Sequence, residues 1–429
     1  MRALVKALCV VLVLCVAIPV VLAFLTLEDT ALVTARRPLS PDDYNRAEKL
    51  IRRAQYALAG IGPSNAVTAS QADLESLASF LAHSVDGLNG TVHVTSEGVR
   101  VLASYQPPRN PIGRFVNLAM TVRQSATGLD IAALDIGRIH LGPRLARPAV
   151  NLAATLILGG ELGDDVIGSI KGLAIADQWA TLTIRPDATI EDRFKERVTD
   201  VAIIARPPAV EAYYRRIMAI ASGYNQVDPV PFVDFLQPLL VMAKDRSAAG
   251  DSVEEMHAMV FALAIYFGGD RLDRLRDILL PRELSGILHY DQYVVVRGRH
   301  DHVQHFIVSA AFTLSGGVGF TTTIGEAKEF DDLLRGGADF SFQDIAADRT
   351  GIAFARVAET KEGADFLESL GSRAHSEDLF FPVVRDLPED MPPRRFNAVY
   401  HDTGSAAFKA MIEEIDRRVH ACEAYKQMN

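Results

Sequence analysis

The sequence predicts an α+β chain with one N-terminal transmembrane helix, a domain that combines helix with antiparallel sheet, and an all-helical domain. Three observations predict it: an apolar run near the N-terminus, period-two alternation between residues 91 and 184, and helical apolar spacing beyond about residue 208. With 429 residues, 49% of them hydrophobic, the chain is long enough for two globular cores. The expected division is a signal anchor at 1–27, a membrane-proximal helix at 28–64, an α+β domain at 65–190 and a helical domain at 191–429.

The first segment predicts the compartment. Arg2 and Lys6 precede an uncharged run over residues 7–27, which at 1.5 Å per residue is long enough to cross a bilayer. The basic flank on the N-terminal side predicts a single-pass inner-membrane protein with its soluble part on the periplasmic side. Cleavage after Ala23 as a signal peptide is the alternative, although Val21 is larger than the residue usually found before such a site. Cys422 is the one cysteine of the soluble part, so neither an intrachain disulfide nor a cysteine metal site is expected there.

The second segment opens with a strong helix start. Ser40 suits an N-cap, Pro41 the first helical position, and Asp42 and Asp43 the first turn. The helix is expected to run to about Leu58 and is rich in arginine and lysine. We interpret it as a stalk beside the membrane with a solvated charged face.

The third segment changes from helical to alternating patterns. Thr68–Ala82 has leucines at helical spacing and predicts a helix. Period-two runs then predict antiparallel strands with one buried face, at 91–94, 99–103, 116–122, 129–136 and 180–184. An apolar helix is expected near Leu145–Leu158.

This order, with Asp73-Leu74 in the helix and Ile136-Gly137-Arg138-Ile139 before the apolar helix, resembles anchored envelope proteins with a tubular lipid-binding (TULIP-like) fold over residues 66–187. The resemblance implies a curved sheet wrapped on a long helix, with an apolar groove for an acyl chain. A plain α+β domain, whose apolar helix fills its own core, is the alternative.

The last segment is mostly helical. Helices are expected at 213–221, 232–243, 253–266, 271–279, 364–370 and 408–425, with Pro238 kinking or breaking the second. Glu254 and His257 have the Glu-x-x-His spacing of di-iron bundles. That motif occurs once, however, and Ser252 with Glu255 also fits a capping box.

The stretch from Arg297 to Gly351 holds the densest set of side chains that could form a site. A helix over 301–314 places Val303, Phe306 and Ile307 on one face. Apolar residues also occur on its other side, so the helix is expected to be buried, with His302 and His305 inside the domain or lining a cleft.

Two imidazoles at i and i+3 can bind one divalent metal ion, and acids from neighbouring helices can complete the site. The predicted metal ligands are His302, His305, Glu329 and Asp348. Within this set, His305 and Asp348 are the candidate catalytic residues. The alternative is a buried network in which carboxylates or carbonyls satisfy the histidines.

Two arginines and two further acids have separate interpretations. Arg297 or Arg299 could hold an anionic substrate. Glu326 follows Thr323, and Asp344 follows Ser341, at the spacing of a capping box. These two acids are therefore interpreted as helix caps rather than ligands.

The same stretch resembles small bacterial envelope families, the VanZ-like proteins and a family of uncharacterised periplasmic lipoproteins. The resemblance rests on His305-Phe306, Lys328-Glu329, Asp332, Ser341-Phe342-x-Asp344 and Asp348-x-x-Gly351. Neither family implies a defined reaction, and this chain differs by carrying His300 and His302.

Charge and motifs exclude several functions. A net charge of −10 without a basic cluster argues against a nucleic-acid partner. The nucleophile elbow, phosphate-binding loop, dinucleotide fingerprint and His-Glu-x-x-His motif are absent from the sequence. The first hypothesis is a non-enzymatic, membrane-anchored envelope protein that binds lipid or an envelope partner. The second is a metal-dependent hydrolase that acts on an envelope ester or phosphoester.

Overall fold

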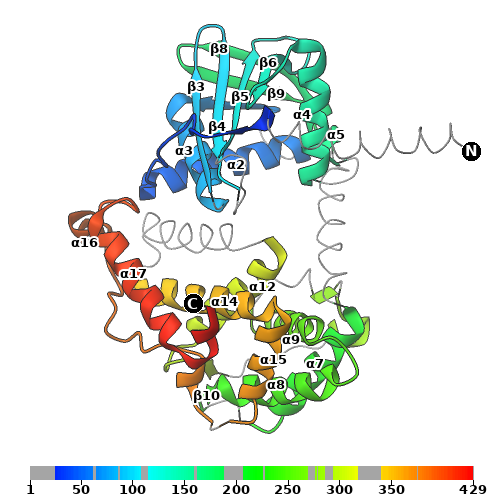
Figure 1. The fold of residues 1–429 in the computed structure, drawn as a ribbon, viewed down its shortest axis with the longest axis vertical. Coiled ribbons are helices and arrows are strands. Elements are labelled where there is room, and N and C mark those ends of the chain that lie inside the picture. Colours follow the sequence, from blue (N-terminus) through cyan, green and yellow to red (C-terminus); the bar gives the residue numbers. More distant parts are fainter. Residues whose placement is uncertain are drawn as a thin grey trace, which may run out of the picture. The chain divides into compact units, whose positions relative to one another are not determined.

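The chain forms two compact units, Met1–Phe194 and Lys195–Asn429, which are considered separately (Figure 1). The computed structural model describes residues 25–60, 64–85, 87–107, 115–158, 162–187, 206–225, 228–268, 276–277, 279–285, 293–316, 340–373 and 375–428.

Unit 1 contains a six-stranded antiparallel sheet. Its strand order is β3-β4-β5-β6-β7, and the short β1 pairs with β5. The strands alternate outward and inward side chains as the sequence pattern requires, so Val92, Val122 and Ile131 are buried. The bounds are β1 Leu27–Glu28, β3 Leu88–Val94, β4 Gly98–Tyr105, β5 Phe115–Arg123, β6 Asp130–Ile136 and β7 Ile139–Leu141.

A second sheet of unit 1 has the order β2-β9-β8, over Ala66–Ser70, Trp179–Ile184 and Ile170–Ala176. The helix predicted from Thr68 therefore starts later, at Gln71, where Ser70 caps α3 (Gln71–Ser84). The first residues form a strand instead because Val67 and Ala69 are buried in register against β9. Local helix propensity therefore places the start of α3 too early, because it does not include the pairing of β2 with β9.

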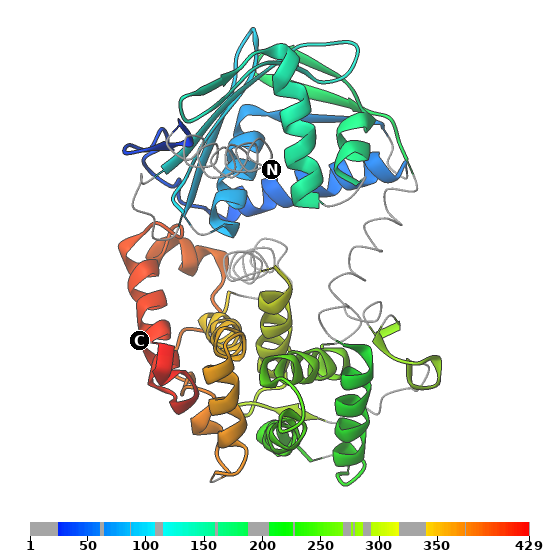
Figure 2. The same ribbon diagram turned by 45° about the vertical axis from the view of Figure 1, so that its right-hand side comes forward.

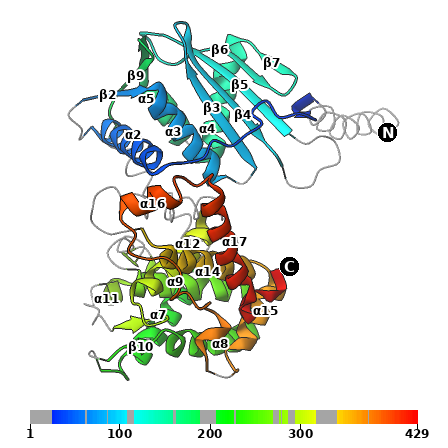
Figure 3. The same cartoon turned by 90° about the vertical axis from the view of Figure 1, so that its left-hand side faces the viewer.

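Helix α2 (Pro41–Ala59) begins after the Ser40 cap, as predicted. It is not a separate stalk, however, because Leu50 and Ala57 are buried in an apolar cluster with residues of β2 and β9. The hydroxyl of Ser76, in α3, also donates a 2.8 Å hydrogen bond to the Asp43 carboxylate. The two helices lie side by side (Figure 3). Unit 1 is completed by α4 (Pro143–Leu158) and α5 (Leu162–Ser169).

The transmembrane helix in the predicted fold class is contradicted. Among the described residues, no helix is both long and apolar enough to cross a bilayer. Residues 7–24 of the predicted apolar run lie outside the described residues. Its last residue, Leu27, belongs to β1 and pairs with Val116 of β5, so the end of the run is part of the main sheet. The fold class is corrected to mixed helix and strand.

Two buried polar side chains hold the segment that follows β1 against the main sheet. The Asn117 Oδ1 accepts hydrogen bonds from the Leu32 N–H at 2.9 Å and from the Ser104 hydroxyl at 2.6 Å. Its Nδ2 donates to the Thr30 carbonyl at 2.9 Å. The Ser104 Oγ in turn accepts from the Val33 N–H at 2.9 Å. The segment over residues 30–33 therefore depends on side chains of β4 and β5.

Replacing Asn117 with alanine should release this segment. We expect unit 1 to lose about 1–3 kcal/mol of unfolding free energy, because buried groups lose their partners. Urea unfolding followed by Trp179, the chain's one tryptophan and a residue of β9, measures this loss. Amide exchange at Leu32 and Val33 should accelerate at the same time. Unchanged exchange there would show that Asn117 does not hold the segment.

The described residues of unit 2 form helices and one pair of two-residue parallel strands, β10 (Val230–Pro231) and β11 (Val294–Val295). Helix α8 continues through Pro238, so the predicted break does not occur there. Helix α14 lies between α12 and α17 (Figure 2). The helices are α7 Pro207–Ala221, α8 Val233–Ser247, α9 Ser252–Phe267, α11 Arg282–Ser285, α12 Asp301–Gly316, α14 Phe342–Ala358, α15 Lys361–Leu370, α16 Pro393–Val399 and α17 Ala406–Ala421, with 3-10 turns at Glu377–Leu379 and Glu423–Met428.

Helix α12 lies in the core of unit 2, and its predicted burial is confirmed. Val303, Phe306 and Ile307 have no exposed surface. The Phe306 ring packs edge-on against Phe354 of α14, with ring centroids 5.5 Å apart. The two helices approach closely at Gly351, where an added Cβ would overlap the Phe306 carbonyl oxygen. This crossing sets the distance between the polar side chains of the two helices.

Candidate metal site

Helices α12 and α14 bring two histidines and two aspartates together. His302 and His305 lie one turn apart on α12, and Asp344 and Asp348 lie one turn apart on α14. All four are buried, with exposed fractions of 1%, 9%, 8% and 6%. Buried ionisable groups are costly unless they are paired or bind a metal, so this cluster needs a physical explanation.

The two histidines face the same carboxylate. His302 Nε2 lies 3.5 Å from Asp344 Oδ1, and His305 Nε2 lies 3.5 Å from Asp344 Oδ2. These separations exceed the roughly 2.7–3.2 Å of an N–H···O hydrogen bond. Each distance is close to the roughly 3.4 Å between two ligand atoms on a tetrahedral ion with bonds of about 2.0–2.1 Å, and each histidine faces a different oxygen of Asp344. Within the described part of the chain, His302 Nε2 is buried and has no hydrogen-bond partner.

The opposite side of His305 is held by a second carboxylate. His305 Nδ1 lies 3.0 Å from Asp348 Oδ1, and the Ser309 hydroxyl donates to the same oxygen at 2.7 Å. A proton on Nδ1 donates to Asp348, which leaves the Nε2 lone pair directed toward Asp344. This is the arrangement in which a carboxylate orients a metal-binding histidine.

The outer side of the cluster carries Asp301, Arg299 and Glu389. One ligand atom each from Asp301, His302 and Asp344 lie within 4.8 Å of one another. Arg299 forms ion pairs with Asp301 and Glu389, and its guanidinium is 3.9 Å from Asp344 Oδ1. Burial alone would raise the pKa of Asp301, but the hydrogen bonds and charge of Arg299 lower it to about 2. Because the side chains of Arg299 and Asp301 are 34% and 43% exposed, this is the side from which a ligand could enter.

The structure brings only some of the predicted metal ligands together. His302 and His305 lie together, whereas Asp348 lies behind His305 and not beside its Nε2. Glu329 is outside the described residues. Asp344, interpreted as a cap, has its N–H bound by the Ser341 hydroxyl at 3.1 Å, yet its carboxylate faces both histidines. The i,i+4 spacing of Asp344 and Asp348 was the signal that both carboxylates share one helix face.

The two predicted substrate-binding arginines lie on different sides of a tight turn. Arg297 and Gly298 have φ of 53° and 83°, as in a two-residue turn closed by the Val296–Arg299 bridge. Arg299 reaches the histidine cluster, as described above. Arg297 instead pairs with Asp378 at 2.7 Å and donates from Nε to the Pro382 carbonyl at 3.1 Å. The described partners of Arg297 therefore lie in the segment that contains Asp378 and Pro382, outside α12 and α14.

The metal-free protein should become less stable as the pH falls below about 6.5. Burial lowers the pKa of His302 from its ordinary 6.5 to about 4, with the negative charge of Asp301 opposing part of this effect. Between these values the unfolded chain binds a proton that the folded chain does not. The free energy of unfolding should therefore drop by up to about 3 kcal/mol between pH 6.5 and 4.

Urea unfolding in a chelator at several pH values checks this dependence, with His302→Asn as the comparison. The difference between the two proteins isolates the histidine from other titrating groups. Equal slopes of stability against pH in both proteins would contradict the assignment.

No family model, no curated protein and no solved structure matches this chain. The resemblances to VanZ-like, lipoprotein and TULIP-like families therefore stay predictions from the sequence. The functional argument rests on the geometry of the site.

Proposed function

We propose that His302, His305 and Asp344 bind a divalent transition-metal ion, and that the protein is a metal-dependent hydrolase of an ester or phosphoester. The observation that carries the proposal is the position of the two Nε2 atoms, each 3.5 Å from an oxygen of the same buried carboxylate. Asp348 supports it by fixing the ring of His305 from behind.

A buried hydrogen-bond network without a metal ion explains the polar atoms of this site less well. In such a network each buried polar atom finds a hydrogen-bond partner, because a missing partner costs about 1–3 kcal/mol. Within the described residues, His302 Nε2 and Asp348 Oδ2 have no such partner. A metal ion bound to His302 Nε2 would be the missing partner of this nitrogen.

Two histidines and one carboxylate leave a position of the metal ion open for water, as in hydrolytic zinc sites. The bound metal would lower the pKa of that water to about 7 and so supply hydroxide near neutral pH. Asp301 lies at the same opening and could orient this water. Arg299 could pair with an anionic oxygen of the substrate, because guanidinium groups bind phosphate and carboxylate through paired hydrogen bonds.

The remaining parts of the functional hypothesis rest on the sequence. We propose an envelope ester or phosphoester as the substrate, and a lipid or envelope protein as a partner of unit 1. The carboxylates and histidines of the site do not identify the substrate or the partner.

Activity assays with and without metal test the hydrolase proposal. Protein loaded with zinc or manganese should hydrolyse bis-p-nitrophenyl phosphate or p-nitrophenyl esters, and a chelator should abolish the reaction. Arg299→Gln should lower kcat/KM for the anionic phosphodiester about tenfold, with a smaller loss for the neutral esters. Arg215→Gln, which alters an exposed arginine paired with Glu211 on α7, serves as the control.

Two results would contradict the proposal. Activity that resists a chelator would exclude a role for the metal. An equal loss on charged and neutral substrates in Arg299→Gln would exclude Arg299 as the group that recognises the anion.

A further inference from the structure

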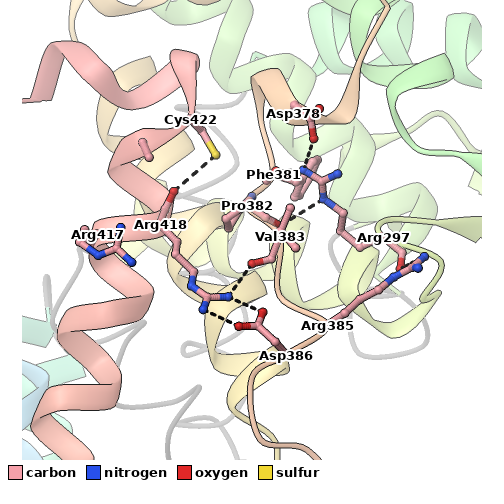
Figure 4. Close-up of a pocket in the computed structure, with 11 residues that line it drawn as sticks. Arg297, Asp378, Phe381, Pro382, Val383, Arg385, Asp386, Arg417, Arg418 and Cys422 are labelled. Carbon is pink, nitrogen blue, oxygen red and sulfur yellow. Dashed lines mark hydrogen bonds and ion pairs between the residues drawn. The ribbon is translucent and has the colours of Figure 1, made fainter.

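A second site-like feature of unit 2 is an open cavity of about 650 Å³ (Figure 4). One wall is the segment over residues 381–386, and the opposite wall is the end of α17 with Cys422. Arg297 and Asp378 close a third side. The cavity is thus separate from the metal site, because neither His302 nor His305 nor Asp344 lines it.

Two arginines fix the wall over residues 381–386. Arg297 donates to the carbonyls of Phe381 and Pro382. Arg418, on the other side, donates to the Val383 carbonyl at 2.9 Å and holds both oxygens of Asp386 at 2.6 and 2.7 Å. These hydrogen bonds lower the pKa of Asp386 to about 2. The backbone acceptors of this wall are therefore used by the protein itself, and its shape is preformed.

The charges around the cavity do not balance. Arg297 is paired with Asp378, Arg418 with Asp386, and Arg417 with Glu414. Arg385 is the fourth arginine that lines the cavity, and it is exposed. Within the described residues it pairs with no carboxylate, and its Nη2 makes only a 3.5 Å contact with the Arg297 carbonyl. One guanidinium is thus available to an external anion.

The surface next to Arg385 is apolar. Phe381, Pro382, Val383 and Ala421 line the cavity together with the buried Cys422. Val383 is 59% exposed, which is a large fraction for a branched apolar side chain at the edge of a cavity. A ligand that covers Val383 would gain from burial of that surface.

We propose that this cavity binds an organic anion with a single apolar chain. The charged head, a carboxylate or a phosphate, pairs with Arg385, and the apolar chain covers Val383 and the Phe381–Pro382 wall. Neither half suffices alone, because an exposed ion pair contributes little and the apolar surface is small. Binding therefore requires both halves in one molecule.

Calorimetric titration of the full chain tests this proposal. The probes are octanoate and octyl phosphate, with acetate lacking the chain and 1-octanol lacking the charge. We expect octanoate, octyl phosphate or both to bind, and acetate and 1-octanol to bind at least tenfold more weakly. The stronger of the two anions identifies the head group. Arg385→Gln should raise the Kd of the anion about tenfold, which corresponds to the loss of one charge-assisted hydrogen bond.

Arg417→Gln is the matched control, because Arg417 lines the same cavity but its guanidinium is bound to Glu414. It should leave the Kd unchanged. Circular dichroism verifies that both variants are folded, as expected for exposed positions. The proposal is overturned if neither anion binds, if 1-octanol binds as tightly as the anions, or if Arg385→Gln leaves the Kd unchanged.

Discussion

Replacing Asp344 with asparagine should abolish metal binding and hydrolytic activity while the protein stays folded. Among the described residues, Asp344 is the one whose carboxylate faces both His302 Nε2 and His305 Nε2. An amide has no negative charge and offers one oxygen, so we expect the affinity for zinc to fall by more than about 100-fold. The fold should survive, because the backbone N–H of Asp344, which donates to the Ser341 N-cap of α14, is unchanged by the substitution. Competition with a chromophoric zinc chelator measures the affinity.

Asp228→Asn is the control for this substitution, because Asp228 is an exposed residue bonded to Asn225. It removes the same charge from unit 2 away from the site. Zinc affinity that survives in a folded Asp344→Asn protein would show that Asp344 is not a ligand.

Gly351→Ala should be among the most destabilising single substitutions in unit 2. The added Cβ would overlap the Phe306 carbonyl oxygen and lie 2.9 Å from its carbon and 3.1 Å from the Ala310 nitrogen. These are backbone atoms of α12, so no side chain can turn away to make room. Moving the two helices apart would weaken the buried contact of Phe306 with Phe354. We expect a loss of about 3 kcal/mol, the upper end for an overpacked core.

The same helix separation should weaken metal binding, because His302 and His305 lie on α12 and Asp344 on α14. Gly250→Ala is the matched control, since its Cβ would lie 3.5 Å from the nearest atom, the Arg246 carbonyl oxygen. Urea unfolding of the three proteins measures the difference. A Gly351→Ala protein as stable as the control would contradict the close crossing of α12 and α14.

Local signals predicted the elements that depend on neighbouring residues. Ser40 with Pro41 marks the start of α2, and the apolar surround of residues 301–314 indicates a buried α12. Elements that depend on distant partners were misplaced. Residues 66–70 form β2 because they pair with β9, where the hydroxyls of Thr68 and Thr181 are 3.0 Å apart across 113 positions of sequence. The apolar run at the N-terminus predicted a membrane span, whereas its end, Leu27, pairs with Val116 in a sheet.

The candidate site shows the same division between local and distant signals. His302 and His305 were recognisable because their spacing places them on one face of one helix. Asp344 was interpreted as a cap, since the pattern after Ser341 describes only the start of its own helix. Its position opposite the histidines depends on how closely α14 crosses α12, which a small residue at position 351 permits. Arg297 and Arg299 could not be distinguished by type or spacing, because only the turn between them sends them to opposite sides.

X-ray absorption spectroscopy of the zinc-loaded protein, combined with elemental analysis, tests the central claim most directly. The account predicts about one zinc per chain, with two imidazole nitrogens and carboxylate or water oxygens at about 2.0–2.2 Å. It also predicts loss of the imidazole signal in a folded His302→Ala/His305→Ala protein. Zinc bound without imidazole, or a folded parent protein that takes up no metal ion, would contradict the proposed site.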